Sequence, residues 1–234
     1  MTIQERFLGL LVGVEAIIFD LDGTLVDSDI WKESEIELLR SLGIRKSEEE
    51  IRFLTADFLP GRDQRAAAVF YRQKFSLDIQ PREIRKRRLK IIKRLIREKG
   101  VSLMPGAREL LELLKGCFKI GLCSSSPPEI IRLMLKKTGI SQYFSVVVSG
   151  EELPESKPHP QPFLETAKRL GVTTNQCLVI EDSSVGVAAA RAAGMKCVQV
   201  LNQTFNQKNL QSDLCFQSLI EIKNLWQGII EGAS

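Results

Sequence analysis

The sequence lacks the features of a membrane-spanning, fibrous or repetitive protein. No apolar run approaches the roughly 20 residues that a membrane-spanning helix needs, and there are no internal repeats or low-complexity tracts. The apolar stretch at residues 7–14 is short, with no basic run before it and no small-residue cleavage site after it, so we do not interpret it as a signal peptide. An ordinary globular protein remains, and 234 residues suffice for one large core and a small accessory domain.

Paired cysteines are also missing. The cysteines are odd in number and include no CxxC pair. Four of the five lie in or beside segments that we interpret below as buried strands. We therefore expect reduced thiols and a cytoplasmic protein. The five are Cys117, Cys123, Cys177, Cys197 and Cys215.

Acidic residues are scarce in one segment only. Residues 82–99 contain ten lysines or arginines and two acidic residues, a charge of +8, so with +4 for the whole chain the remainder carries −4. A generally basic protein that coats nucleic acid is not built in this way, although one basic helix can still meet an anionic partner.

From residue 101 onward, short β-branched, apolar runs alternate with longer amphipathic ones. This alternation predicts strand–helix units and a parallel sheet with helices on both faces, so the expected fold class is α/β. Proline in the first turn marks three of the four expected helix starts. The strands are expected at residues 15–19, 118–123, 144–148, 177–181 and 196–201, and the helices begin near Pro105, Pro127, Pro160 and Ser183.

Between residues 27 and 103 no comparable strands occur, and the segment is predicted to be helical. In its clearest helix, at residues 81–99, one apolar stripe lies opposite a strongly basic face. The chain is therefore expected to form an α/β core domain from residues 1–26 and 104–234, interrupted by a helical domain at residues 27–103. The stripe consists of Ile84, Ile91, Ile92, Leu95 and Ile96.

Two aspartates follow the first expected strand directly. Asp20 and Asp22 lie at the carboxyl end of a buried strand, where parallel-sheet folds bind their ligands, and Gly23 lets the backbone leave at a sharp angle. Alone, such a pair fits an Asx-rich turn equally well. The whole run to Ser28, DLDGTLVDS, resembles the signature DxDGTLxDS of the haloacid dehalogenase-like superfamily.

Three further segments match that superfamily in order and spacing. Ser124 ends the second core strand, Lys157 lies between a serine and a proline, and the pair Glu181 and Asp182 precedes a small-residue helix. Taken singly, they would be a helix cap, a solvated loop lysine and an acidic helix N-terminus. Together they imply a Rossmann-like core. The helical insertion is similar to the C1-type cap of the branch that contains beta-phosphoglucomutase and phosphoglycolate phosphatase.

The resemblance implies a magnesium-dependent phosphatase that acts on a small phosphomonoester, such as a sugar phosphate. Asp20 would be the nucleophile and become phosphorylated, while Asp22 would serve as general acid and then general base. The Mg²⁺ ion would be held by Asp20, the backbone carbonyl of Asp22 and Asp182, with Glu181 as a ligand or an outer-shell orienter.

The remaining site residues follow from the same resemblance. Lys157 would add a second positive charge beside the transferring group, and Ser124 with the backbone N–H groups around Ser125 would hold the phosphoryl oxygens. In the cap, Arg62 and Arg65 are expected near the substrate, where they would pair with a phosphate or carboxylate; exposed arginines at a helix start are the alternative.

Two other functions stay open. A phosphomutase of the beta-phosphoglucomutase type uses the same two aspartates, but its cap histidine is missing here: Trp31 and Lys32 occupy that region, and the only histidine, His159, is expected to be structural. A non-catalytic protein would use the basic helix at residues 81–99 as a docking surface. A solvated helix face is the commoner meaning of such a basic run, and steering anionic substrates towards the site is a third alternative. The retention of every catalytic group argues against a purely binding role, and nucleic acid is not the expected partner. Cap closure is expected to hinge near residues 27 and 103.

Overall fold

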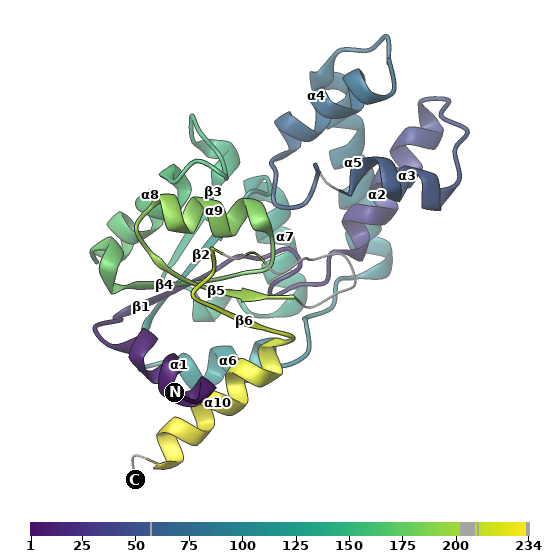
Figure 1. The fold of residues 1–234 in the computed structure, drawn as a ribbon. Helices are drawn as coiled ribbons and strands as arrows, with labels where there is room; N and C mark the ends of the chain where they lie inside the picture. The colour runs from purple at the N-terminus through teal and green to yellow at the C-terminus, as the bar shows by residue number, and fades with distance from the viewer. Residues whose placement is uncertain (57, 202–208, 210, 233–234) are drawn as a thin grey trace.

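A six-stranded parallel sheet forms the centre of the protein in the computed structural model, which describes residues 1–56, 58–201, 209 and 211–232 (Figure 1). The strand order is β3-β2-β1-β4-β5-β6. All five predicted strands are confirmed to within two residues at each end, whereas the three-residue β6 was not predicted. The strands are β1 (Ala16–Phe19), β2 (Lys119–Ser124), β3 (Val146–Ser149), β4 (Cys177–Glu181), β5 (Lys196–Val200) and β6 (Leu214–Phe216).

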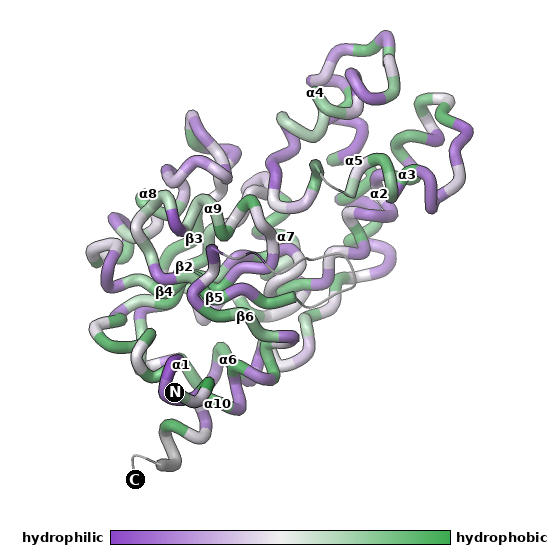
Figure 2. The backbone as a smooth tube through the Cα atoms, viewed as in Figure 1, coloured by the Kyte–Doolittle hydropathy of each residue, from purple (hydrophilic) through white to green (hydrophobic). Residues whose placement is uncertain are grey.

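The central strand β1 is buried on both faces, which explains its unbroken apolar sequence. Ile17 and Phe19 point into one hydrophobic cluster, and Ala16 and Ile18 point into another on the opposite face. Hydrophobic residues accordingly run along the central strands in Figure 2. The strands β2 and β3 lie on one side of β1, and β4, β5 and β6 lie on the other. The strand order therefore reverses between β1 and β4, and ligands of such sheets bind at this point.

Helices cover both faces of the sheet. The second cluster is closed by α8 (Gln161–Leu170) and α9 (Ser184–Ala192). The first is covered by four further core helices, of which the terminal two were not predicted, and a long helix of the insertion, described below, adds to it. The four are α1 (Ile3–Leu11), α6 (Ala107–Leu114), α7 (Pro128–Thr138) and α10 (Leu219–Gly232).

The apolar stretch near the N-terminus belongs to this core. Phe7 in α1 is fully buried, and its ring meets those of Trp226 and Phe216 edge-on, with centroids 5.1 and 5.9 Å away. The stretch therefore packs against α10 and β6. Within the described part of the chain, no helix combines the length and apolarity required to cross a membrane.

The insertion after β1 is helical, as predicted, and we call its four helices the cap. Eight residues form a hydrophobic cluster of the cap's own, including Ile84. The apolar stripe of α5 leaves this cluster partway along the helix, because Ile92, Leu95 and Ile96 belong to the sheet cluster instead. One long helix thus ties the two cores together. The cap helices are α2 (Asp29–Ser41), α3 (Glu48–Thr55), α4 (Gln64–Lys74) and α5 (Pro81–Lys99).

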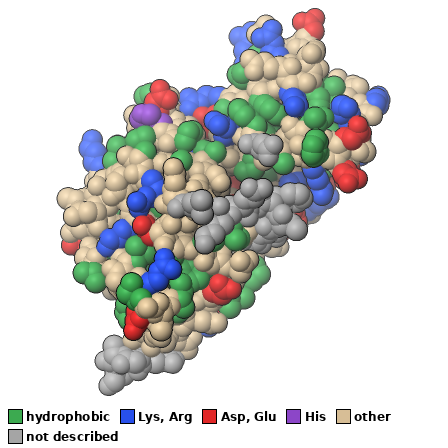
Figure 3. Space-filling model, in the orientation of Figure 1, with side chains coloured by type: hydrophobic (Ala, Val, Ile, Leu, Met, Phe, Trp, Pro, Cys, Tyr) green, Lys and Arg blue, Asp and Glu red, His purple; other side chains and the backbone are tan. Residues whose placement is uncertain are grey.

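The basic face of α5 differs from the prediction at one position. Arg88 is buried, because it lies four residues from both Ile84 and Ile92 and so shares the apolar stripe. Four of the other nine cations pair with acidic side chains of neighbouring elements, for example Arg94 with Glu37. Acidic and basic side chains are interspersed on the cap face seen in Figure 3, and a docking role for the basic face of α5 stays a prediction.

The two chain segments that connect cap and core lie side by side. Val26 and Leu103 form an antiparallel bridge, flanked by hydrogen bonds from Asp27 N to the Ser102 carbonyl (3.0 Å) and from Met104 N to the Leu25 carbonyl (2.9 Å). Both predicted hinge positions, residues 27 and 103, fall within this two-stranded ribbon. Hinge motion there remains a prediction.

Candidate active site

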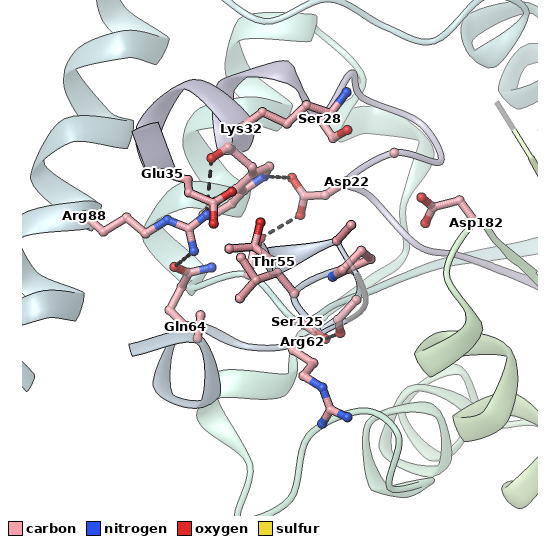
Figure 4. Close-up of a pocket in the computed structure, with 18 of the residues that line it drawn as sticks. Asp22, Ser28, Lys32, Glu35, Thr55, Arg62, Gln64, Arg88, Ser125 and Asp182 are labelled. Carbon is pink, nitrogen blue, oxygen red and sulfur yellow. Dashed lines mark hydrogen bonds between the residues drawn. The ribbon is translucent and has the colours of Figure 1, made fainter. Parts of the chain in front are cut away.

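A cavity of about 200 Å³ lies where the cap meets the carboxyl ends of the strands. Its core side is lined by Asp20, Asp22 and Asp182, together with Ser125 and Ser126. The cap side receives residues from all four cap helices and from the loop between α3 and α4, several of which are drawn in Figure 4. Three of the four predicted acidic residues therefore converge on one cavity, and the fourth, Glu181, is fully buried behind it.

Lys157 is a buried bridge between two carboxylates. Its Nζ donates to Asp20 Oδ1 at 2.7 Å, to Glu181 Oε1 at 2.8 Å and to the Cys123 carbonyl at 2.8 Å. All three ammonium protons are therefore used, and the residue is only 3% exposed. The ends of β1, β2 and β4 meet through this one side chain.

Asp182 supplies a third carboxylate directly after β4. Its Oδ1 accepts a hydrogen bond from Thr24 Oγ1 at 3.3 Å. Gly23 has a φ of +88°, and a Cβ atom there would lie 2.3 Å from Asp182 Oδ2. Only glycine lets the turn after β1 approach this carboxylate. Asp20, Glu181 and Asp182 each present one oxygen, and these oxygens lie within 4.8 Å of one another.

These three carboxylates fit a divalent cation. Oxygen ligands are those that Mg²⁺ prefers, and the three carboxylates each present one oxygen to the same small space. The oxygens of Glu181 are already engaged, Oε1 by Lys157 and Oε2 by the backbone N–H of Ser183 at 2.7 Å and its hydroxyl at 3.0 Å. This favours Asp20 and Asp182 as direct ligands, with Glu181 orienting Lys157.

The helix after Glu181 contains small residues for a steric reason. A Cβ atom at Gly186 in α9 would lie 1.7 Å from Glu181 Oε1. The first turn of the helix therefore packs directly against the carboxylate that positions Lys157. Ser183 caps the same helix, because its hydroxyl accepts from Gly186 N at 3.0 Å.

Asp22 is surrounded by hydrogen-bond donors. Its Oδ1 accepts from the indole N–H of Trp31 at 2.6 Å, and its Oδ2 accepts from the hydroxyls of Ser126 at 2.6 Å and Ser124 at 3.2 Å. Trp31 belongs to the cap, so the two parts of the protein meet at this carboxylate. Neither the Trp31 contact nor the role of Ser126 was predicted.

The serine triplet after β2 has three separate contacts. Ser124 Oγ accepts from the backbone N–H of Ser126 at 3.0 Å as well as donating to Asp22. Ser125 Oγ donates to the carbonyl of Gly61 at 2.8 Å, and Gly61 directly precedes the predicted substrate-binding residue Arg62. Both predicted phosphoryl-binding serines therefore line the junction of cap and core, and their contact with phosphate remains a prediction.

Burial shapes the proton affinities of the site. It raises the pKa of Asp20 well above the ordinary carboxyl value, a rise that Lys157 opposes and that Glu181 and Asp182 reinforce. Burial likewise raises the pKa of Asp22, against the hydrogen bonds from Ser126 and Trp31. For Lys157 burial alone would lower the pKa, but the Asp20 and Glu181 carboxylates outweigh it and raise the pKa well above its usual value, so the lysine stays charged.

The two predicted specificity arginines are placed differently. Arg62 lines the cavity, and its guanidinium carbon lies 4.4 Å from the centroid of the Phe58 ring. Arg65 is not among the described residues that line the cavity; its Nε and Nη2 donate to Asp63 Oδ2 at 3.2 and 2.9 Å. His159 is exposed and accepts from Gln161 N at 3.2 Å at the start of α8, consistent with a structural role.

The cap wall of the cavity contains polar residues that were not predicted. Glu35, Thr55, Gln64 and Arg88 are all buried and all line the space opposite the acidic cluster (Figure 4). They come from four different helices, so no local motif links them. Helical periodicity was the one available indication, because it places Arg88 on the apolar stripe of α5.

Comparisons with known proteins agree with this geometry. A sequence profile of haloacid dehalogenase-like hydrolases matches residues 14–194. Hexitol phosphatase B of Escherichia coli is 34% identical over 189 residues, which cover 79% of this chain and 82% of that protein. Phosphoglycolate phosphatase of Nitrosococcus oceani is 32% identical over 222 residues, covering 90% of this chain and 96% of the other.

Solved structures show the same architecture. A putative beta-phosphoglucomutase from Thermotoga maritima superposes with a TM-score of 0.73 at 27% sequence identity, covering 92% of this chain and all of that one. The likeness extends across both the sheet and the helical insertion.

Proposed function

The chain belongs to the haloacid dehalogenase-like hydrolases and is a phosphoric monoester hydrolase of that family, and from this premise we propose that it cleaves a small phosphomonoester through magnesium-dependent attack by Asp20 on phosphorus. The observation that carries the proposal is the buried cluster in which Lys157 joins Asp20 to Glu181, with Asp182 alongside. A nucleophilic carboxylate needs such surroundings, because a phosphate dianion repels it.

Some of these residues bring positive charge to the phosphoryl group, and others bind its oxygens. Asp20, Asp182 and the backbone carbonyl of Asp22 would hold Mg²⁺, which would supply positive charge to the phosphoryl oxygens. Lys157 adds a second, fixed positive charge, since its raised pKa keeps it protonated. Ser124 and the backbone N–H groups near Ser125 hold the non-bridging oxygens.

The reaction proceeds in two half-reactions. An oxygen of Asp20 bonds to phosphorus while the bond between phosphorus and the leaving oxygen breaks, and Asp22 transfers a proton to that oxygen. Asp22 then takes a proton from water, whose oxygen attacks the aspartyl-phosphate and releases inorganic phosphate. The raised pKa of Asp22 suits it to hold a proton in the first half-reaction, whereas Asp20 stays ionised beside the cation.

The substrate is a small phosphate ester, as the names of the relatives suggest. Arg62 lines the cavity, which supports the proposal that it pairs with an anionic group of the substrate. We propose a supporting role for Arg65, which fixes the Asp63 carboxylate at the start of α4. A cytoplasmic location accords with five cysteines that form no disulfide in the structure.

A phosphomutase activity is the competing proposal. The structural likeness to a putative beta-phosphoglucomutase favours it, whereas the names of the sequence relatives and the replacement of the cap histidine by Trp31 favour hydrolysis. Incubation with beta-glucose 1-phosphate and a hexose bisphosphate separates the two, because a mutase forms glucose 6-phosphate and a phosphatase forms free glucose and phosphate.

The direct test is Asp20→Asn, assayed by phosphate release from a panel of about 100 metabolites. The wild-type protein is expected to be active with Mg²⁺ and inactive with EDTA, and the variant to keep no more than a few per cent of the activity. Asp78→Asn, an exposed aspartate far along the cap, serves as the matched control. A folded Asp20→Asn protein with wild-type turnover would refute the proposal.

A further inference from the structure

Glu35 is a buried carboxylate in the wall of the cavity, and one of its two oxygens has no hydrogen-bond partner. It lies on α2, is 6% exposed, and the oxygen without a partner within the described structure is Oε1. Burial raises the pKa of Glu35, whereas the charge of Arg88 and the nearby hydroxyls of Thr55 and Tyr71 lower it. The Tyr71 hydroxyl, which also has no hydrogen-bond partner within the described residues, has a single proton and can donate to only one oxygen of Glu35, which leaves the other for a ligand. Thr55, however, donates to the Ile51 carbonyl at 3.0 Å. A buried acceptor left in this way costs free energy that a ligand can recover.

The neighbouring Arg88 does not satisfy Glu35, because its guanidinium is used elsewhere. It donates through Nε to Ser34 Oγ at 3.3 Å, through Nη1 to Gln64 Oε1 at 3.0 Å and through Nη2 to the Trp31 carbonyl at 3.2 Å. Figure 4 shows Arg88 directed at Gln64, with the Glu35 carboxylate turned towards the cavity. Rotation about the last torsion of a glutamate is soft, so either carboxylate oxygen can face a ligand there.

The charges around Glu35 restrict what that ligand group can be. A carboxylate or phosphate placed against it would be repelled by Glu35 itself. An ammonium group would face Arg52 and Arg88, which line the cavity and whose charges act on Glu35. A neutral hydrogen-bond donor remains, and among phosphate esters that donor is a hydroxyl group.

We propose that Glu35 is a specificity-determining residue that accepts a hydrogen bond from a hydroxyl of the leaving alcohol, so that the substrate is the phosphate ester of a sugar or polyol. The inference rests on the proposed function and names the substrate class of the same site. The phosphoryl group lies against Asp20 and Asp22, and the hydroxylated end of the chain extends across the cavity to α2.

The test compares three esters that differ at the end remote from phosphorus. Glucitol 6-phosphate carries hydroxyls, hexyl phosphate has the same chain length without them, and phosphoglycolate ends in a carboxylate. Each is assayed with wild-type protein, Glu35→Met, Glu35→Gln and the control Glu33→Gln, whose side chain lies on the same helix and pairs with Lys99. Thermal unfolding establishes that each variant is folded.

Wild-type protein is expected to prefer glucitol 6-phosphate over both other esters in kcat/KM by about 10-fold or more. Glu35→Met is expected to lose about 10- to 100-fold on glucitol 6-phosphate while changing little on hexyl phosphate. Glu35→Gln, which keeps a neutral acceptor and the same shape, falls between the two, and Glu33→Gln matches wild type. Equal losses on all esters, or a wild-type preference for phosphoglycolate or hexyl phosphate, would overturn the inference.

A binding measurement separates this inference from the proposed function. Failure of the wild-type protein to hydrolyse any ester counts against the phosphatase mechanism. The dissociation constant of glucitol 6-phosphate, measured by calorimetry in Asp20→Asn with and without Glu35→Met, then still decides the role of Glu35. Weaker binding by about 10-fold in the double variant supports it, and equal binding refutes it.

Discussion

The indole N–H of Trp31 donates a hydrogen bond of 2.6 Å to Oδ1 of Asp22, so a cap side chain holds the carboxylate proposed as the general acid. Ser126 Oγ holds the other oxygen at 2.6 Å. Donors of this kind favour the ionised form, while burial favours the protonated one. The position of the cap therefore influences the proton affinity of a core residue.

Replacing Trp31 by Phe should move the pH dependence of the reaction. The substitution removes one donor, so the pKa of Asp22 rises further, and the protonated acid needed in the first half-reaction persists to higher pH. We expect the alkaline limb of the kcat profile to shift towards higher pH. Trp226→Phe, a buried tryptophan in the sheet cluster, controls for lost aromatic packing; a shift to lower pH, or the same shift in both variants, would contradict the prediction.

The two adjacent acidic residues at the end of β4, Glu181 and Asp182, should respond oppositely to neutralisation. Asp182→Asn removes a charge that raises the pKa of Asp20, and its amide oxygen can still accept from Thr24, so without Mg²⁺ the free energy of unfolding should rise by about 1 kcal/mol. Glu181→Gln breaks the buried pair with Lys157 and should cost about 3–5 kcal/mol.

Urea unfolding with EDTA or excess Mg²⁺ distinguishes these effects. Magnesium should stabilise the wild-type protein and have little effect on Asp182→Asn, because the cation stabilises only a fold that binds it. If both substitutions destabilised the metal-free protein equally, the assignment of Asp182 as ligand and Glu181 as lysine partner would be wrong.

A methyl group added at Gly186 should disturb the site through Glu181. The new Cβ atom would lie 1.7 Å from Glu181 Oε1, so either the carboxylate or the start of α9 must move. We expect Gly186→Ala to lower the free energy of unfolding by about 1–3 kcal/mol and to weaken magnesium binding. Gly228→Ala in α10 meets no atom within 4 Å and should instead stabilise the helix by about 0.5–1 kcal/mol. Equal effects at both positions would contradict the steric account.

Glu151 should help to keep the cap closed. Its side chain, in the 3₁₀ turn after β3, accepts from Arg85 of α5 and from the backbone N–H of Gln64 at 2.9 Å. Glu151→Gln weakens the contact with Arg85, and we expect KM to rise about 3- to 10-fold with a smaller change in kcat. The exposed neighbour Glu152, changed to Gln, is the control. An unchanged KM would show that closure does not depend on this contact.

Much of the core could be predicted because short sequence patterns determine it. Runs of β-branched, apolar residues predict buried strands. Because the carboxyl ends of parallel strands meet at one edge of the sheet, Asp20, Ser124 and Asp182 are expected to lie together whatever the loops do. The strand β6 has three residues, too few for a pattern. The packing of α1 against Trp226 depends on a contact more than 200 residues away in sequence.

The cap side of the site was less predictable for a geometric reason. The face of each cap helix that meets the cavity depends on the orientation of the cap relative to the sheet. No local sequence pattern predicts that orientation. Glu35 and Gln64 therefore looked like ordinary polar residues of amphipathic helices. Arg88 was hidden among ten basic residues, although its spacing from Ile84 and Ile92 had placed it on the buried side.

The pairing of Val26 with Leu103 means that the helical insertion leaves and re-enters the core at a single place. Any other segment whose two ends lie equally close can be inserted between these positions without changing the order of the strands. Apart from the contact of Trp31 with Asp22, the core residues proposed to act on phosphorus are thus separable from the cap residues proposed to select the alcohol, so the insert can be exchanged or remodelled while the aspartates stay in place.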